Sequence, residues 1–284
     1  MSVFHKAPHI FTGHLELKVT DIERSLEFYK NMIGFKVLER TEYSAVLTAN
    51  GESALLTIEQ PKDIIPKQHR TTGLYHFAIL LPSRSDLGSV IKHLSVNRYP
   101  IQGGSNHKVS EALYLADPDE NGIELYADTP KSTWKWQGDM IEMGNDILDV
   151  EGLIAQAQGN EWNGLPSETV MGHIHMHVSE LEKTAKFYQQ GLGFELTFRF
   201  PNQALFFSTG GYHHHIAVNT WNGKGAPEPA KNSVGIKYFE LVFPDEDTRK
   251  KAVNQLEEMD YYTKEKNGVT VTRDPSGNEI HLVV

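Results

Sequence analysis

An internal repeat is the feature that most limits how this chain can fold, because repeated sequence builds repeated substructure. The segment 13–37 (GHLELKVTDIERSLEFYKNMIGFKV) aligns without a gap with the segment 172–196 (GHIHMHVSELEKTAKFYQQGLGFEL). Two further pairs align at nearly the same offset: GLYHFAILLP from Gly73 with GIKYFELVFP from Gly235, and DPDENGIELY from Asp117 with DPSGNEIHLV from Asp274. We therefore predict two similar domains, 9–128 and 169–284, joined by a connection over 129–168.

Each half divides again into two units of the same plan. A strand with alternating apolar residues precedes a helix whose apolar side chains recur at steps of four, three and four residues. Glycine follows where the helix should end, and three short strands complete the unit. The helix positions are Ile22, Leu26, Tyr29 and Ile33 in the first half and Leu181, Ala185, Tyr188 and Leu192 in the second. The sequence thus predicts an α+β fold of four βαβββ modules, with a second helix over 86–94 and a short helix within 147–157.

Composition narrows the chemistry. The chain has no cysteine, so any metal must be held by His, Asp, Glu, Tyr or carbonyl oxygen. A net charge of −10 argues against nucleic acid and anionic membrane surfaces as partners. No apolar run approaches the roughly 18 residues that span a bilayer, and the first residues lack the apolar stretch of a signal peptide. We expect a cytoplasmic protein that binds a small molecule.

The modules resemble those of the vicinal oxygen chelate superfamily, which includes glyoxalase I, bleomycin and fosfomycin resistance proteins and extradiol catechol dioxygenases. Helices that end in Gly-Phe and strands entered through DP-x-x-N/G motifs carry this likeness. The stretches KVSEALYLADPDENGIELYAD, GHIHMHV and YHHHIAVN are most similar to the two-domain catechol 2,3-dioxygenases. The resemblance implies two open-barrel domains, each made by a pair of modules around a potential metal site.

The resemblance also implies that metal ligands come from the first and last strands of the paired modules. Glu124 is the only carboxylate at those positions, and a non-haem Fe(II) dioxygenase needs two imidazoles and one carboxylate on one face of the metal. Glu124 and its module partner His76 therefore belong to the expected site. The eight candidate positions are His14, Leu56, His76, Glu124, His173, His215, Tyr238 and His281.

The third ligand depends on which modules pair. If neighbours within a half pair, the site is His14, His76 and Glu124. If module two pairs with module three, the site is His76, Glu124 and His173. Only the second pairing also adds a further imidazole, that of His215, which matches the residues that extradiol enzymes use. It is therefore preferred, with His14 as the alternative third ligand. The positions in module four, Tyr238 and His281, lack a carboxylate and are expected to be degenerate or structural.

Two catalytic residues are implied by the same resemblance. His215 lies 42 residues after His173 and is the expected acid/base histidine, and Tyr114, ten residues before Glu124, is expected to stabilise a developing oxyanion. Within the triplet HHH, strand alternation predicts that His213 and His215 share one face while His214 faces the packed side.

The expected function is an extradiol ring-cleaving dioxygenase. It would convert catechol or a substituted catechol and O₂ to a 2-hydroxymuconic semialdehyde type product, with Fe(II) as cofactor. Mn(II) is an alternative metal, Zn or Ni could occupy the site in a crystal, and a homo-oligomer is an open expectation. The alternatives are a glyoxalase-type metal-dependent lyase or isomerase, whose sites usually have two carboxylates, and a non-catalytic small-molecule-binding resistance protein, which usually lacks the triad.

Overall fold

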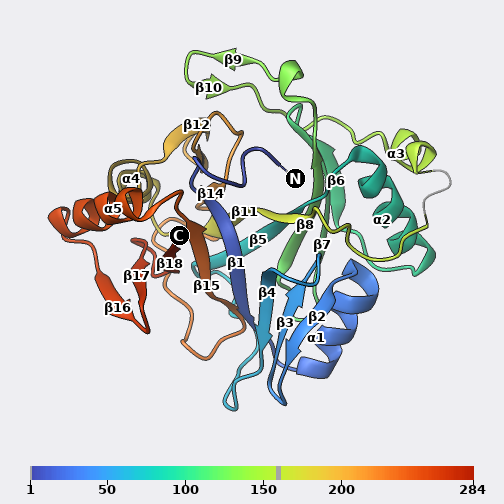
Figure 1. The fold of residues 1–284 in the computed structure, drawn as a ribbon, viewed down its shortest axis with the longest axis horizontal. Helices are drawn as coiled ribbons and strands as arrows, with labels where there is room; N and C mark the ends of the chain where they lie inside the picture. Colours follow the sequence, from blue (N-terminus) through green and yellow to red (C-terminus); the bar gives the residue numbers. More distant parts are fainter. Residues whose placement is uncertain (1, 158–160) are drawn as a thin grey trace.

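Strands of the four modules form two eight-stranded mixed sheets in the computed structural model, which describes residues 2–157 and 161–284 (Figure 1). The first sheet contains, in spatial order, β16 (Thr263–Lys266), β17 (Val269–Arg273), β18 (Glu279–Val283), β15 (Gly235–Val242), β1 (Phe11–Lys18), β4 (Ala54–Glu59), β3 (Ser44–Thr48) and β2 (Lys36–Arg40). The second contains β12 (Glu195–Phe200), β13 (Ala204–Ser208), β14 (Ile216–Asn219), β11 (Val170–His177), β5 (Gly73–Leu80), β8 (Gly122–Asp128), β7 (Ser110–Ala116) and β6 (Gly103–Asn106).

In each sheet the two central strands come from different halves of the sequence. The first strand of module one, β1, runs antiparallel to β15 of module four, and β11 of module three runs antiparallel to β5 of module two. The structure therefore confirms the pairing of module two with module three, and the alternative pairing of modules one and two is wrong. The ranges 9–128 and 169–284 are the two copies of the repeat along the chain. Neither range forms a sheet by itself, because each sheet takes strands from both of them.

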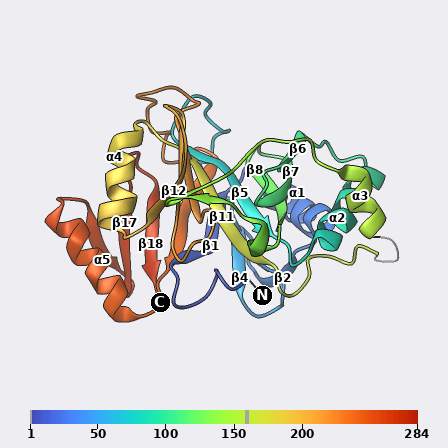
Figure 2. The same cartoon turned by 90° about the horizontal axis from the view of Figure 1, so that it is seen from above.

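Helices cover the two ends of the molecule. One end carries α1 (Ile22–Phe28), its π-helical continuation η1 (Tyr29–Ile33), α2 (Arg84–Val96) and α3 (Val150–Gln156), and the other carries α4 (Leu181–Lys186), its continuation η3 (Phe187–Gly191) and α5 (Glu246–Glu258) (Figures 1 and 2). The predicted helices over 86–94 and within 147–157 are confirmed by α2 and α3. Gly34 ends the first helix at φ 92°, a left-handed conformation that favours glycine.

The connection between the halves returns to the second sheet. After the short helix η2 (Lys131–Thr133), a small hairpin of β9 (Trp136–Gln137) and β10 (Met140–Ile141) leads into residues 143–147. Asp146 pairs with Asn106 at the end of β6, so this part of the connection lies along the edge of the sheet. The connection thus forms one wall beside the concave face of that sheet.

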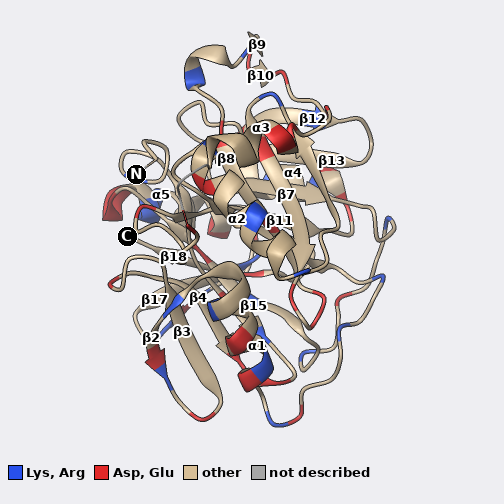
Figure 3. Ribbon diagram, turned by 90° about the vertical axis from the view of Figure 1, so that its right-hand side faces the viewer, with Lys and Arg blue, Asp and Glu red and all other residues tan. Residues whose placement is uncertain are grey.

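Lys and Arg lie among Asp and Glu along helices and loops (Figure 3), and the central strands of the second sheet, β5 and β11, carry none of these residues. In the described part of the chain, no helix has both the length and the apolar character needed to cross a lipid bilayer.

Candidate metal centre

Three side chains from three adjacent strands converge on the concave face of the second sheet. His76 Nε2 lies 3.0 Å from Glu124 Oε2, His173 Nε2 lies 3.2 Å from the same oxygen, and the two nitrogens are 3.3 Å apart. All three residues are buried, and among the described residues this is the group of histidine and acidic side chains whose ligand atoms converge closely enough to hold an ion. The structure therefore brings together the preferred triad.

Strand register explains how residues so far apart in sequence meet. Ala78 on β5 pairs with His173 on β11 at one side and with Glu124 on β8 at the other. Residues in register across neighbouring strands point to the same face, and His76, two residues before Ala78, shares that face. The small Ala78 side chain leaves space in the middle of the row, so the three longer side chains can meet above it.

The protonation states suit a cation. Burial by itself would raise the pKa of Glu124, but the adjacent His173 and His76 rings outweigh it and hold that pKa well below its usual value. Burial lowers the pKa of His173 to about 4, against the partly compensating attraction of Glu124. At neutral pH the site therefore presents a carboxylate with a neutral imidazole lone pair beside it, which are the forms that bind a metal.

The spacing of the ligand atoms fits a divalent ion as well. Bonds of about 2.0–2.2 Å to imidazole nitrogen or carboxylate oxygen, at right angles, place neighbouring ligand atoms about 3 Å apart. The observed separations of 3.0–3.3 Å match this, and three mutually adjacent ligands occupy one face of an octahedron. The opposite face would remain available to other ligands, as in non-haem Fe(II) oxygenases.

The triad lies at the base of a cavity of about 650 Å³. Its walls come from the second sheet, from the connection and from the segment after β14. Its lining includes Tyr75, His107, Tyr114, Met143, Ile147, His175, Phe198, Phe200, Phe206, His214 and Trp221. Much of the cavity lining is aromatic. Two of these side chains are partly open to solvent, since Phe200 and Trp221 are 44% and 46% exposed.

Tyr114 stands beside the carboxylate of the triad. It pairs with Glu124 across β7 and β8 and lines the cavity, as its predicted role requires. His107 Nδ1 lies 2.8 Å from the carbonyl oxygen of Gly144 and must donate to it, so His107 Nε2 accepts the Tyr114 hydroxyl at 2.7 Å. Burial, with the nearby Glu124 charge, raises the pKa of Tyr114 well above its usual value, which keeps the phenol protonated.

The histidine triplet is arranged differently from the prediction. His215 is buried away from the cavity, with Nε2 3.1 Å from the Phe4 carbonyl oxygen and Nδ1 3.2 Å from Ser208 Oγ. His214 lines the cavity, and its ring centroid lies 4.1 Å from that of His173. The predicted orientation of His214 toward the packed side is therefore wrong, and the structure does not bring His215 to the site.

The physical reason is local backbone geometry. β14 begins only at Ile216, and the preceding Gly210 and Gly211 have φ of 68° and 70°. Strand alternation holds only inside a regular strand, so it cannot be extended backwards into this turn. The two consecutive glycines are the sequence signal for this turn, which frees His214 from the alternation. His215 still bonds to both neighbouring strands, and it is kept from the cavity by the Phe4 carbonyl and the Tyr212 ring that pack against it.

The equivalent positions in the first sheet form no such triad. His14 Nε2 is 2.8 Å from Thr57 Oγ1, and its Nδ1 is 3.9 Å from Glu240 Oε1. Tyr238 stacks on His281 with ring centroids 3.7 Å apart. The alternative ligand His14 thus lies in a different sheet from His76 and Glu124, as the module pairing requires.

The chain is similar to proteins of a known family. The family model described as Glyoxalase/Bleomycin resistance protein/Dioxygenase superfamily matches residues 12–125 and 170–282. A catechol-2,3-dioxygenase of Bacillus subtilis (strain 168) is 42% identical over the full length of both chains. A biphenyl-2,3-diol 1,2-dioxygenase of Rhodococcus globerulus is 27% identical over 41% of this chain and 62% of its own.

Solved structures share the fold at low sequence identity. Glyoxalase I of Zea mays superposes with a TM-score of 0.61 at 17% identity, covering 96% of this chain and 92% of its own. A Bacillus subtilis protein superposes with a TM-score of 0.64 at 10% identity, covering 96% and 84%. Both likenesses concern the fold. With its two matched segments and its full-length relative, the chain belongs to the glyoxalase/bleomycin resistance protein/dioxygenase superfamily.

Proposed function

We propose that the protein is an extradiol dioxygenase that cleaves catechol, or a substituted catechol, with O₂ to a 2-hydroxymuconic semialdehyde type product. The observation that carries the proposal is the facial arrangement of His76, Glu124 and His173 at the base of an aromatic-lined cavity. The full-length similarity to a catechol-2,3-dioxygenase supports the same reaction. We further propose Fe(II) as the metal, held by these three residues, with Mn(II) as the alternative.

A bound Fe(II) would supply a site where both catechol oxygens and O₂ meet and where electron density can pass from the ring to O₂. The protein supplies proton transfer and orientation. His214 faces the cavity, and its Nδ1 is engaged by His213 at 2.8 Å, so Nε2 is the nitrogen able to take a proton from a catechol hydroxyl. In this proposal the acid/base role expected of His215 belongs to His214.

Tyr114 has the second role. Its hydroxyl hydrogen, which in the free protein points to His107 Nε2, can turn toward a substrate oxygen and stabilise negative charge there. Aromatic side chains of the inner wall, Phe198 and Phe206, would pack against the catechol ring. Such a low-dielectric wall strengthens the interactions of His214 and Tyr114 with the reacting oxygens.

The test is reconstitution and turnover. Protein prepared without O₂ is loaded with Fe(II), its metal content is measured, and catechol and O₂ are added. The expected result is uptake of O₂ with the appearance of the yellow ring-cleavage product, and ¹⁸O₂ labels both of the new oxygen atoms. A Glu124→Ala variant, which lacks the carboxylate ligand, should show neither.

Iron-loaded protein that consumes no O₂ with catechol or with alkyl- and aryl-substituted catechols would overturn the proposal. Formation of cis,cis-muconate, the product of cleavage between the hydroxyl groups, would also overturn it. A cytoplasmic location and a homo-oligomeric state stay predictions of the sequence, to be tested by fractionation and by light scattering.

A further inference from the structure

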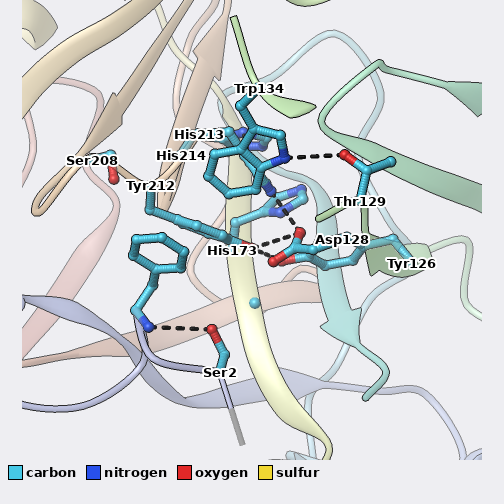
Figure 4. A network of polar contacts seen from close by, with 12 residues as sticks. Ser2, Tyr126, Asp128, Thr129, Trp134, His173, Ser208, Tyr212, His213 and His214 are labelled. Atoms are coloured by element: carbon cyan, nitrogen blue, oxygen red, sulfur yellow. Dashed lines mark hydrogen bonds and ion pairs between the residues drawn. The ribbon is translucent and has the colours of Figure 1, made fainter. Parts of the chain in front are cut away.

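His214 is connected to an acidic side chain through a second buried histidine. Its Nδ1 lies 2.8 Å from His213 Nδ1, and His213 Nε2 lies 2.9 Å from Asp128 Oδ1 (Figure 4). His213 is fully buried and His214 is 5% exposed, so each contact lies inside the protein. The three side chains form a continuous line from the cavity wall to the end of β8.

Hydrogen-bond chemistry fixes the direction of this line. A carboxylate only accepts, so His213 Nε2 must carry the hydrogen that faces Asp128. In a neutral His213 the other nitrogen, Nδ1, is then an acceptor, and the hydrogen between the two rings belongs to His214 Nδ1. His214 is thereby left with an unprotonated Nε2, the nitrogen available to the cavity.

The carboxylate that anchors the line is itself held in place. Tyr212 donates its hydroxyl to Asp128 Oδ1 at 3.2 Å, and the Tyr126 and Tyr212 hydroxyls are 2.7 Å apart (Figure 4). Trp134 packs edge-on against His213, with ring centroids 5.4 Å apart. Asp128 and Glu124 are four residues apart on β8 and point to the same face, so one strand carries both a metal ligand and the anchor.

We propose that Asp128 and His213 are positioning residues that hold His214 in the tautomer with Nε2 free toward the cavity. The inference rests on the proposed function, because it assigns a purpose to the acid/base role of His214. It concerns a ground-state arrangement of hydrogens, which exists whether or not the enzyme turns over. A carboxylate–histidine pair that sets a catalytic tautomer has a known analogue in serine proteases, where losing the carboxylate leaves the wrong tautomer.

The decisive measurement reads the tautomer directly. Metal-free protein labelled with ¹⁵N in its histidine rings is studied by long-range ¹H–¹⁵N correlation, and the His214 signals are assigned from their loss in His214→Gln. The expected pattern has hydrogen on Nδ1 and a bare Nε2. A wild-type His214 with hydrogen on Nε2 would overturn the inference without any variant, and would leave the proposed reaction untouched.

Variants separate positioning from packing. In Asp128→Asn the amide group can donate to His213, which reverses the line and places hydrogen on His214 Nε2. We expect that tautomer change, with kcat lowered by about 100-fold and KM changed by less than about threefold. Tyr212→Phe removes a hydroxyl from the same carboxylate and is the matched control, expected to retain the wild-type tautomer.

Two outcomes would contradict this assignment. One is an Asp128→Asn protein, folded and with normal metal content, that keeps the wild-type tautomer of His214. The other is a Tyr212→Phe protein that loses kcat to the same extent as Asp128→Asn, since the line would then act only through packing. Wild-type protein with the expected tautomer but no ring cleavage would instead remove the proposed function and leave the hydrogen arrangement standing.

Discussion

His14 and His173 occupy equivalent positions in the two halves of the sequence, yet only His173 lies within hydrogen-bonding distance of a carboxylate. His173 Nε2 is 3.2 Å from Glu124 Oε2, whereas His14 Nδ1 is 3.9 Å from Glu240 Oε1 and its Nε2 is engaged by Thr57. The strands beside them account for the difference, because β11 is next to the module that carries Glu124 and β1 is not. The repeat thus yields one metal centre of the proposed kind.

Replacing His173 should therefore weaken metal binding strongly, and replacing His14 should not. His173→Ala removes one of three ligands, and we expect Fe(II) or Mn(II) affinity to fall by about 100-fold or more. His14→Ala removes an imidazole at the equivalent position of the other sheet and serves as the control. Calorimetric titration of metal-free protein with Mn(II) gives both affinities. Loss of metal in His14→Ala with retention in His173→Ala would reverse the assignment of the ligand.

Tyr114→Phe should lower kcat with little effect on metal content. The substitution removes the hydroxyl beside Glu124 and keeps the ring, so the loss reports stabilisation of charge on the substrate. We expect kcat to fall by about 100-fold, the order found when one such donor is removed. Tyr99→Phe removes a hydroxyl that donates to Ala116 O outside the cavity lining and is the control. A kcat for Tyr114→Phe equal to that of the control would refute the role.

The Trp221→Ala substitution should raise KM more for a substituted catechol than for catechol itself. Trp221 is half exposed at the cavity wall and contacts Tyr75 and His175, so its indole can cover an apolar substituent that extends from a catechol ring. We expect KM for a 4-alkylcatechol to rise about tenfold, equivalent to about 1.4 kcal/mol, and KM for catechol to change much less. Trp136 on β9 is similarly exposed but does not line the cavity, which makes Trp136→Ala the matched control. An equal change in KM for both substrates would show that Trp221 does not contact the substituent.

Acid should weaken the fold partly through His14. Burial, and to a smaller extent the nearby His281, lower the pKa of His14 from 6.5 to about 4. The unfolded chain therefore binds more protons than the native protein between these values, and the free energy of unfolding rises with pH across this window. The contribution is complete above pH 6.5 and is lost as the pH falls toward 4; it is on the order of 3 kcal/mol.

Urea unfolding from pH 4 to 7 measures this effect. His14→Gln should flatten the pH dependence of the free energy of unfolding, since a neutral amide does not titrate. Thr57→Val removes the hydrogen-bond partner of His14 and leaves the buried imidazole, so its pH dependence should stay close to that of the wild type. An unchanged pH slope in His14→Gln would show that other groups cause the acid sensitivity.

Much of the fold could be read from the sequence because it depends on periodicity and repetition. The four modules, the helices and the glycine that ends the first helix all follow from local pattern. The partner of each module could not be read in this way, because the same apolar strands satisfy either pairing. Glu124 completes a triad in either pairing, so the pairing that the structure has was favoured only by the additional imidazole expected from His215, which the resemblance to extradiol enzymes implies.

The choice between His214 and His215 shows where pattern reasoning fails. Counting 42 residues from His173 leads to His215, and β14 does pair with β11 in the register that this count assumes, with Ile174 opposite Ile216. The count is right for His215, whose backbone bonds to both neighbouring strands and whose ring meets Ser208 on the face that Phe206 shares, but the Phe4 carbonyl and the Tyr212 ring cover it at a distance from the cavity. Alternation fails one residue earlier, at His214, which lies outside the ladder. A side-chain direction can be inherited from a strand only as far as its ladder of hydrogen bonds extends.

The exchange of strands between the two halves also has a consequence for how the molecule assembles. β1 pairs with β15 across more than two hundred residues, with Phe11 opposite Val242, and the donor atoms of the metal centre come from both sides of the connection. Contacts of such sequence separation form slowly, because long loops must close before the contacts stabilise them. The nascent first half can carry His76 and Glu124 but cannot complete their coordination, so acquisition of the ion must wait until β11 has docked on β5. Metal uptake should thus report that the chain has been made at least as far as β11 and that β11 has docked on β5.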